Sequence, residues 1–262
     1  MYDEQRKYLA KAEESYLRVA LVIEYDGTNY CGWQVQKNGV SIQQKIEEAL
    51  QKALGRRTAI HGSGRTDAGV HALGQVAHFE AQTDIPADKF FYVLNDLLPQ
   101  DIRIIRSYEV ADDFHARFCA KGKHYRYVIH NARAKGAVNR LYSMFVPVPL
   151  DMGRMEEAAK HIEGTHDFSA FCAAGTDIKG TVRTVDEVRL GRDGDYIIVD
   201  VVGSGFLYNR VRIIAGTLIA VGKGKMEPAE VKEAIDKKDR TLAGATAQAQ
   251  GLFLVEVFYT AL

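Results

Sequence analysis

The sequence predicts an α+β fold in which two ferredoxin-like halves, each of the order βαββαβ, follow one another and share one mostly antiparallel sheet. Three observations predict it. Short runs of branched apolar residues alternate with amphipathic segments of helical period. The same order of segments occurs twice in 262 residues, and no stretch rich in proline or serine separates the two occurrences. We expect helices on one face of the sheet and a broad cleft on the other.

The first half is predicted to contain four strands and two helices. Ser41 begins the first helix, because Gln44 follows three residues later as in a capping box. Pro86 begins the second helix and Pro99 ends it. We expect strands at 17–25, 57–61, 75–80 and 102–110, and helices at 41–54 and 86–98.

The second half repeats this order and adds an insertion before its last strand. The glycine-containing turn GRDGD joins two of its strands as a hairpin. We expect strands at 125–130, 182–190, 196–202 and 252–259, helices at 152–163 and 206–221, and a further helix at 228–238 within the insertion 226–250. The predicted organisation is therefore an N-terminal extension (1–16), a first half (17–113) and a second half (114–262).

Composition restricts the classes of function. Lysine plus arginine and aspartate plus glutamate both number 34, so the total charge neither requires nor excludes a polyanionic partner. The three cysteines are widely spaced without a CxxC pair, which indicates a reducing compartment and argues against a zinc site. No apolar run is long enough to span a bilayer. We expect a cytoplasmic protein without a membrane role.

A glycine-rich stretch, GSGRTDAGVHALG from Gly62 to Gly74, is the candidate active site. Its four glycines argue against a helix or a regular strand, so it is expected to form a loop. Arg65 and Asp67 are two positions apart, so both can face one pocket. A carboxylate that a neighbouring guanidinium keeps ionised is a usable nucleophile. The alternative is that Asp67 only caps a turn.

A segment of one charge sign follows the first half. Between 115 and 140 the chain has seven lysines and arginines and no acidic residue, which indicates a polyanionic partner. Tyr125 and Tyr127 would share one face of a strand, with His124 and Arg126 on the other. Such tyrosines can stack on nucleic-acid bases or pack in the core, and both interpretations stay open.

Two arginines lie in the otherwise apolar segment 206–221. Arginine in such a helix is costly unless an acid lies opposite, and Asp67 is the candidate partner for Arg212. For Arg210 we expect the side chain to reach the surface.

No cofactor or metal site is predicted. GSGRTDAG has Asp67 where the dinucleotide fingerprint requires a glycine, and no phosphate-binding GxxxxGK[ST] motif occurs. His61, His71 and His78 could gather near the loop, but histidines spread over strands are more often structural than ligands.

The chain resembles the TruA-type tRNA pseudouridine synthases over nearly its whole length from Val19. Six motifs in the order of that family carry the resemblance. They are YDGTNYCGWQ, GSGRTDAGVHALGQVAHF, FHARFCAKGKHYRYVI, HDFSAF, GSGFLYNRVRIIAGTL and GLFLVEV.

The resemblance implies an activity, a substrate and roles for residues. The family isomerises uridines at positions 38 to 40 of the tRNA anticodon stem-loop to pseudouridine, as homodimers and without a cofactor. By resemblance Asp67 is the catalytic aspartate and Arg212 its basic partner. Tyr125 corresponds to the tyrosine that stacks on the target base and assists proton removal. Arg65 corresponds to the arginine that helps to displace that base.

The residues alone leave two rival functions. A non-catalytic RNA-binding protein would explain the basic segment, although a carboxylate in a purely binding groove would repel phosphate. A nucleoside hydrolase would use Asp67 to activate water. For pseudouridine formation, three steps stay open for Asp67: attack at C1′, attack at C6 of uracil, or removal of the C2′ proton.

Overall fold

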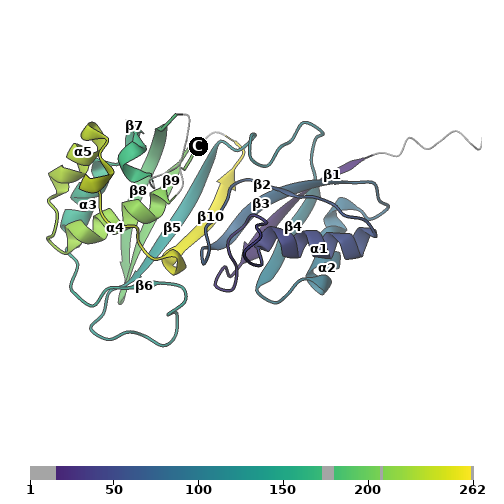
Figure 1. Cartoon of the computed structure of the whole chain (residues 1–262), viewed down its shortest axis with the longest axis horizontal. Coiled ribbons are helices and arrows are strands. Elements are labelled where there is room, and N and C mark those ends of the chain that lie inside the picture. The colour runs from purple at the N-terminus through teal and green to yellow at the C-terminus, as the bar shows by residue number, and fades with distance from the viewer. Residues whose placement is uncertain (1–15, 173–179, 207–208, 261–262) are drawn as a thin grey trace, which may run out of the picture.

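The computed structural model describes residues 16–172, 180–206 and 209–260. The expected N-terminal extension therefore lies outside the described residues, apart from Tyr16. The described chain forms one sheet with the strand order β4-β1-β3-β10-β5-β9-β8-β7, while β2 pairs with β3 and β6 with β5. Figure 1 shows this sheet running across the whole molecule.

The first half of the sheet has the ferredoxin-like order, with β1 between β3 and β4 and β2 at the far side of β3. α1 follows β1, and α2 follows β3. The bounds are β1 Leu17–Tyr25, α1 Ile42–Leu54, β2 His61–Gly62, β3 His71–Ala81, α2 Phe90–Leu97 and β4 Ile102–Glu109, with a 3₁₀ turn at Ala87–Lys89.

The second half repeats that order as β10-β5-β9-β8, and the short β7 extends its edge. The bounds are β5 Gly122–His130, β6 Met144–Phe145, α3 Met152–Lys160, β7 Gly164–Asp167, β8 Val182–Asp193, β9 Tyr196–Gly203, α4 Arg210–Gly222, α5 Pro228–Lys237 and β10 Leu252–Phe258. Further 3₁₀ turns lie at Phe168–Phe171, Arg240–Leu242 and Ala249–Gly251. The two predicted ferredoxin-like halves and the shared sheet are confirmed.

The halves meet where β10 pairs with β3 in parallel, through Phe253 opposite His71 and Leu254 opposite Ala72. The other neighbours along the main path of the sheet are antiparallel. Because β10 lies between β3 and β5, the loop that precedes β3 is brought close to the second half.

The helices cover one face of the sheet, as expected. Val19, Leu21 and Ile23 of β1 are fully buried toward them, whereas Arg18 and Glu24, of opposite parity, are not. Phe79 of β3 packs edge to face on Phe90 of α2 at 5.0 Å between ring centroids. In Figure 1 the helices form two groups, α1 with α2 and α3 with α4 and α5, with β5 and β10 visible between them.

The predicted strand at 57–61 is wrong. β2 comprises only His61 and Gly62, because side chains of α1 satisfy the preceding backbone. The Ile60 N–H donates to Glu47 Oε1 at 3.2 Å, and Gln43 Nε2 donates to the Ile60 carbonyl at 3.3 Å. These groups are therefore unavailable to a sheet partner.

Several predicted boundaries also move, and two of these shifts concern the candidate site. β3 begins at His71 instead of 75, so the glycine-rich loop shrinks to 63–70. Gly74 lies inside this strand because a Cβ there would come within 2.4 Å of the Val255 carbonyl oxygen of β10. α4 begins at Arg210 instead of 206, since Asn209 has a left-handed backbone conformation with φ 60° that no helix continues through.

Gly216 of α4 allows the segment 244–247 to lie against the helix backbone. A Cβ at Gly216 would be 1.7 Å from the Ala245 carbonyl oxygen. The same segment holds Arg212, whose carbonyl accepts from the Ala247 N–H at 3.0 Å. Close packing here therefore positions a candidate site residue.

We expect Gly216→Ala to lower the free energy of unfolding by about 2 kcal/mol, although alanine usually stabilises a helix interior relative to glycine. Chemical denaturation measures this difference. Gly191→Ala on β8 is the control, because a Cβ there meets nothing within 4 Å and should leave stability nearly unchanged. Equal stability of both variants would show that the 244–247 segment moves away without cost.

Candidate active site

The segment that follows β1 holds the loop 63–70 in place. The hydroxyls of Tyr25 and Thr66 lie 2.7 Å apart, and the Trp33 N–H donates to the Thr66 carbonyl at 3.0 Å. Gly32 has φ +102°, and a Cβ there would come within 2.6 Å of the same carbonyl oxygen. The loop is thus bound to β1 and to the residues before α1, which fixes the position of Asp67.

The Asp67 carboxylate faces Arg212 of α4, as the sequence predicts. Arg212 Nη1 donates to Asp67 Oδ2 at 3.3 Å, and both side chains are about four-fifths buried. The guanidinium is itself fixed, because its Nε donates to the Ala247 carbonyl at 2.8 Å and its Nη1 to Asn209 Oδ1 at 2.9 Å. Among the described contacts, the carboxylate of Asp67 makes no hydrogen bond that caps its own turn.

Burial raises the pKa of Asp67 above its ordinary value, and the charge and hydrogen bond of Arg212 offset this effect only in part. The guanidinium of Arg212 does lower the pKa of Asp67, as expected for a neighbouring cation, but the effect of burial is larger. A carboxylate with a raised folded pKa loses no stability in acid. It contributes stability as the pH falls through its folded pKa, because the folded state binds the proton more tightly.

Tyr125 of β5 lies beside this pair on the helix-bearing face. It is 7% exposed, and its ring meets that of Phe206 edge to face at 5.0 Å between centroids. Burial raises the pKa of its hydroxyl, and the nearby Tyr25 and Asp67 raise it further. The hydroxyl is therefore protonated at neutral pH and can donate a hydrogen bond. No described residue accepts from it.

Asp67 and Tyr125 line a cavity of about 690 Å³. Exposed Arg65 also lines it, but no described carboxylate pairs with its guanidinium. The cavity is bordered by Gln43 of α1 and by the first residues of α4. It therefore opens between the two helix groups on the helix-bearing face of the sheet, and the expected position on the opposite face is wrong. The reason is that Tyr125 and the loop 63–70 both project to the side of the helices.

The basic segment does not form a single surface. Lys123 donates from Nζ to the Ser63 carbonyl at 2.9 Å, so it ties β5 to the loop of Asp67, and burial lowers its pKa to about 8. Arg126 lies on the opposite face, as expected, where its Nε donates to Asp200 at 2.9 Å. Tyr127 is fully buried and donates to the Gln248 carbonyl at 2.7 Å. The core interpretation holds for Tyr127.

Sequence reasoning missed several residues of the cavity wall. Phe118 is 75% exposed and lies against His115, with ring centroids 4.3 Å apart. Its position in a segment of alternating basic and aromatic residues was the available signal. Arg183 lies near the start of β8 and Phe206 follows β9, both far from Asp67 in the sequence, so only the folded chain brings them together with it.

Only two of the three candidate histidines lie close together. His61 and His78 lie near His115, with ring centroids 5.2 and 4.7 Å from His78, whereas His71 contacts Asp26. Within the described ranges no group of three or more histidine, cysteine, aspartate or glutamate side chains is arranged to hold a metal ion. The described helices include none that is long and apolar enough to cross a bilayer.

Comparison with known proteins places the chain in a family. The profile of the family described as tRNA pseudouridine synthase matches residues 21–119 and 158–260. A tRNA pseudouridine synthase A of Ruminiclostridium cellulolyticum is 50% identical over 243 residues, 92% of this chain and 99% of the relative. Proteins with the same name from Geotalea uraniireducens and Bacillus licheniformis are 51% identical over 242 residues and 48% over 246. Those alignments cover 92% and 93% of this chain, and 99% of each relative.

A solved H/ACA RNP bound to a substrate RNA containing 2'-deoxyuridine aligns with a TM-score of 0.38 and 14% identity, over 77% of this chain and 44% of that one. The matched profile includes the loop of Asp67, the start of the basic segment and α4. The chain belongs to the tRNA pseudouridine synthase family, whose members isomerise uridine in tRNA to pseudouridine.

Proposed function

We propose that this enzyme converts uridines 38, 39 and 40 of the tRNA anticodon stem-loop to pseudouridine, with Asp67 as the nucleophile and with the target base flipped into the cavity. The observation that carries the proposal is the pairing of Asp67 with Arg212 at the wall of a cavity that Tyr125 also lines. The stem-loop positions come from the resemblance of the glycine-rich loop and the KHYRY segment to the TruA type. On the same basis we propose a cytoplasmic homodimer.

The reaction needs little beyond an ionised carboxylate and a closed site. The bond between N1 and C1′ breaks, the uracil turns, and C5 joins C1′. The C5 proton leaves and N1 gains a proton, so there is no net oxidation or hydrolysis. Attack by Asp67 at C1′ or at C6, or removal of the C2′ proton, each requires its charged form. Arg212 supports that form against the effect of burial.

The position of Asp67 supports base flipping. The carboxylate is about four-fifths buried at the wall of the cavity, so a base stacked in a helix would not reach it. Extruding a nucleotide costs a few kcal/mol, roughly, and stacking on an aromatic ring offsets part of this. Exposed Arg65 also lines the cavity and forms no ion pair with a described carboxylate, so its guanidinium can help to displace the base or bind the strand.

Each half of the sheet contributes different residues to the active site. We propose 17–113 and 114–262 as the two structural units. The first supplies Asp67 and Arg65, and the second supplies Tyr125 and Arg212. The site is then complete only where β3 and β10 join.

Tyr125 offers a test of stacking against proton transfer. We expect Tyr125→Leu to lower kcat/KM about 30-fold, because base stacking on an aromatic ring is worth about 1–3 kcal/mol. Tyr125→Phe keeps the ring, so it should reduce the rate only if the hydroxyl takes part. Rates of both variants on one tRNA transcript measure the difference. Equal activity of Tyr125→Leu and wild type would remove Tyr125 from the site.

The substrate positions are tested by mapping pseudouridine at nucleotide resolution in unmodified tRNA transcripts after incubation with the pure protein. We expect modification at 38, 39 and 40 wherever uridine occupies them. Modification confined to another region of the tRNA would contradict the proposed substrate site and leave the family assignment intact.

A further inference from the structure

Arg210, the first residue of α4, carries a buried charge. Its side chain was expected to reach the surface, but the residue is only 1% exposed. Its guanidinium lies over the ring of Phe168 at 4.6 Å and donates from Nη1 to the Gly205 carbonyl at 2.9 Å. Its Nε and Nη2 are buried and have no hydrogen-bond partner among the described residues. The expectation was wrong because the guanidinium packs on Phe168 and bonds to the Gly205 carbonyl instead of reaching solvent.

No carboxylate of the described chain forms an ion pair with this guanidinium. Asp67 is paired with Arg212, and Asp167 is engaged by Lys238 at 2.9 Å and by Ser169. Burial lowers the pKa of Arg210 to about 9 and the charge of Arg183 acts in the same direction, while Cys172 and Asp167 offset these effects only in part. Arg210 is nevertheless charged at neutral pH. A buried charge without a partner is costly for the folded protein, so an anion from outside is the expected compensation.

The N-terminus of α4 is open at the same place. Asn209 stands at the capping position but makes no capping hydrogen bond, because its Oδ1 accepts from Arg212. The first turn has no acidic residue either. The free N–H groups at the start of a helix bind anions, and Asn209, Arg210 and Val211 all line the active cavity.

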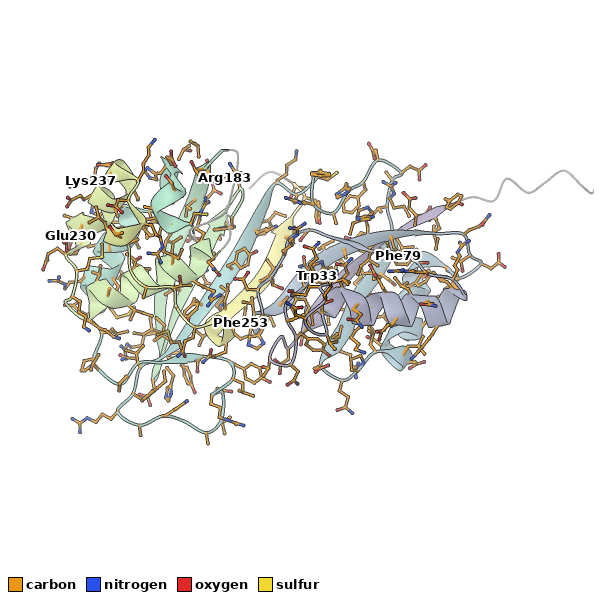
Figure 2. All side chains as sticks on the ribbon, in the orientation of Figure 1. Trp33, Phe79, Arg183, Glu230, Lys237 and Phe253 are labelled. Atoms are coloured by element: carbon orange, nitrogen blue, oxygen red, sulfur yellow. The ribbon has the colours of Figure 1, made fainter. Side chains whose placement is uncertain are left out.

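Arg183, which lies near the start of β8 and is labelled in Figure 2, also lines this cavity. Its Nη1 donates to the Val182 carbonyl at 2.6 Å, and no described carboxylate forms an ion pair with it. Its side chain approaches Gly205, to whose carbonyl Arg210 is bonded. Two guanidinium groups that form no ion pair with any described residue, and a helix start without a side-chain cap, thus meet beside the site of Asp67.

We propose that this end of the cavity, formed by Arg183, the first N–H groups of α4 and Arg210 beneath them, is an anion site that binds a backbone phosphate of the RNA strand next to the target nucleotide. The proposal rests on the proposed function. Arg183 and the helix N–H groups contact the phosphate. Arg210 adds charge from the buried side, where few solvent molecules screen it. A phosphate held here lets the strand approach the negative charge of Asp67.

The test compares Arg183→Gln and Arg210→Met with Arg192→Gln, an exposed β8 arginine outside the cavity wall that donates to Asn131. The dissociation constant of a tRNA transcript is measured at several salt concentrations, together with the melting temperature. We expect about 10-fold weaker binding at low salt for the two cavity variants. Their log–log salt slope should shrink by about 0.7, the value for one phosphate of a single strand. The control should match wild type.

Stability separates this role from a structural one. Arg210→Met removes an unneutralised buried charge at similar volume, so its melting temperature should equal or exceed that of wild type. Unchanged affinity and salt slope in Arg183→Gln would overturn the proposal, as would a lower melting temperature of Arg210→Met with an unchanged slope. The positions that the wild-type enzyme modifies are mapped without either variant. That experiment therefore tests the proposed function independently of the phosphate site.

Discussion

Asp67→Asn is expected to lower the single-turnover rate of pseudouridine formation by about 10⁴-fold or more while tRNA binding stays within a few-fold of wild type. Asparagine keeps the shape of the side chain and can still accept a hydrogen bond from Arg212. It has no charge, so it cannot act as a nucleophile at C1′ or C6 or as a base at C2′. The rate is measured by quench and nucleotide mapping, and affinity by filter binding.

Asp84→Asn provides the matched control for this variant, because Asp84 is an exposed acid of the first half that does not line the cavity. It should keep the wild-type rate. Measurable turnover by Asp67→Asn, beyond what deamidation back to aspartate explains, would remove the proposed nucleophile from the mechanism.

Arg212→Gln is expected to lower the rate at neutral pH by roughly 10²-fold. Removing one partner of a buried ion pair costs about 3 kcal/mol, here as lost stabilisation of the charged carboxylate. Burial already raises the pKa of Asp67, and Arg212 is the main opposing influence. Without the guanidinium a larger fraction of Asp67 is protonated and inactive. The free energy of unfolding, measured in the same variant, should fall by less, because a protonated carboxyl group tolerates burial.

Arg212→Lys is the companion variant. Lysine keeps the positive charge but cannot reproduce the fixed geometry in which Arg212 donates to Asp67, Asn209 and Ala247 at once. Its rate should fall between those of wild type and Arg212→Gln. A rate for Arg212→Lys as low as that of Arg212→Gln would mean that orientation, and not charge, is what Arg212 contributes.

Local patterns predicted most of the fold. The capping box at Ser41 marks the start of α1, where Ser41 Oγ accepts from the Gln44 N–H at 3.2 Å. Alternation over β5 predicted that Tyr125 and Tyr127 share one face of the strand, with His124 and Arg126 on the other. The stretch 57–60 failed because its backbone bonds to side chains of α1, a contact between elements that no local pattern encodes.

The pairing of residues in the site was predicted from the sequence, but the burial and contacts of those residues were not. A buried arginine requires an acidic partner, and on this basis the sequence correctly predicted the pairing of Arg212 with Asp67, although the two are 145 residues apart. The balance between burial and charge at Asp67 depends on the depth of the cavity, which only the folded chain sets. The same is true of Arg210, since the ring of Phe168 and the Gly205 carbonyl that surround it come from other segments. Family membership excludes the two rival functions, a purely binding protein and a nucleoside hydrolase.

The dependence of the single-turnover rate on pH, in wild type and Arg212→Gln, tests the central claim most directly. If ionised Asp67 carries the reaction, the rate of wild type falls as the pH drops through a pKa above the ordinary range of aspartate. In Arg212→Gln the same fall should move to higher pH, and the rate should recover toward wild type in mildly alkaline solution. Identical acid limbs in the two proteins would contradict the claim that Arg212 keeps the reacting carboxylate charged.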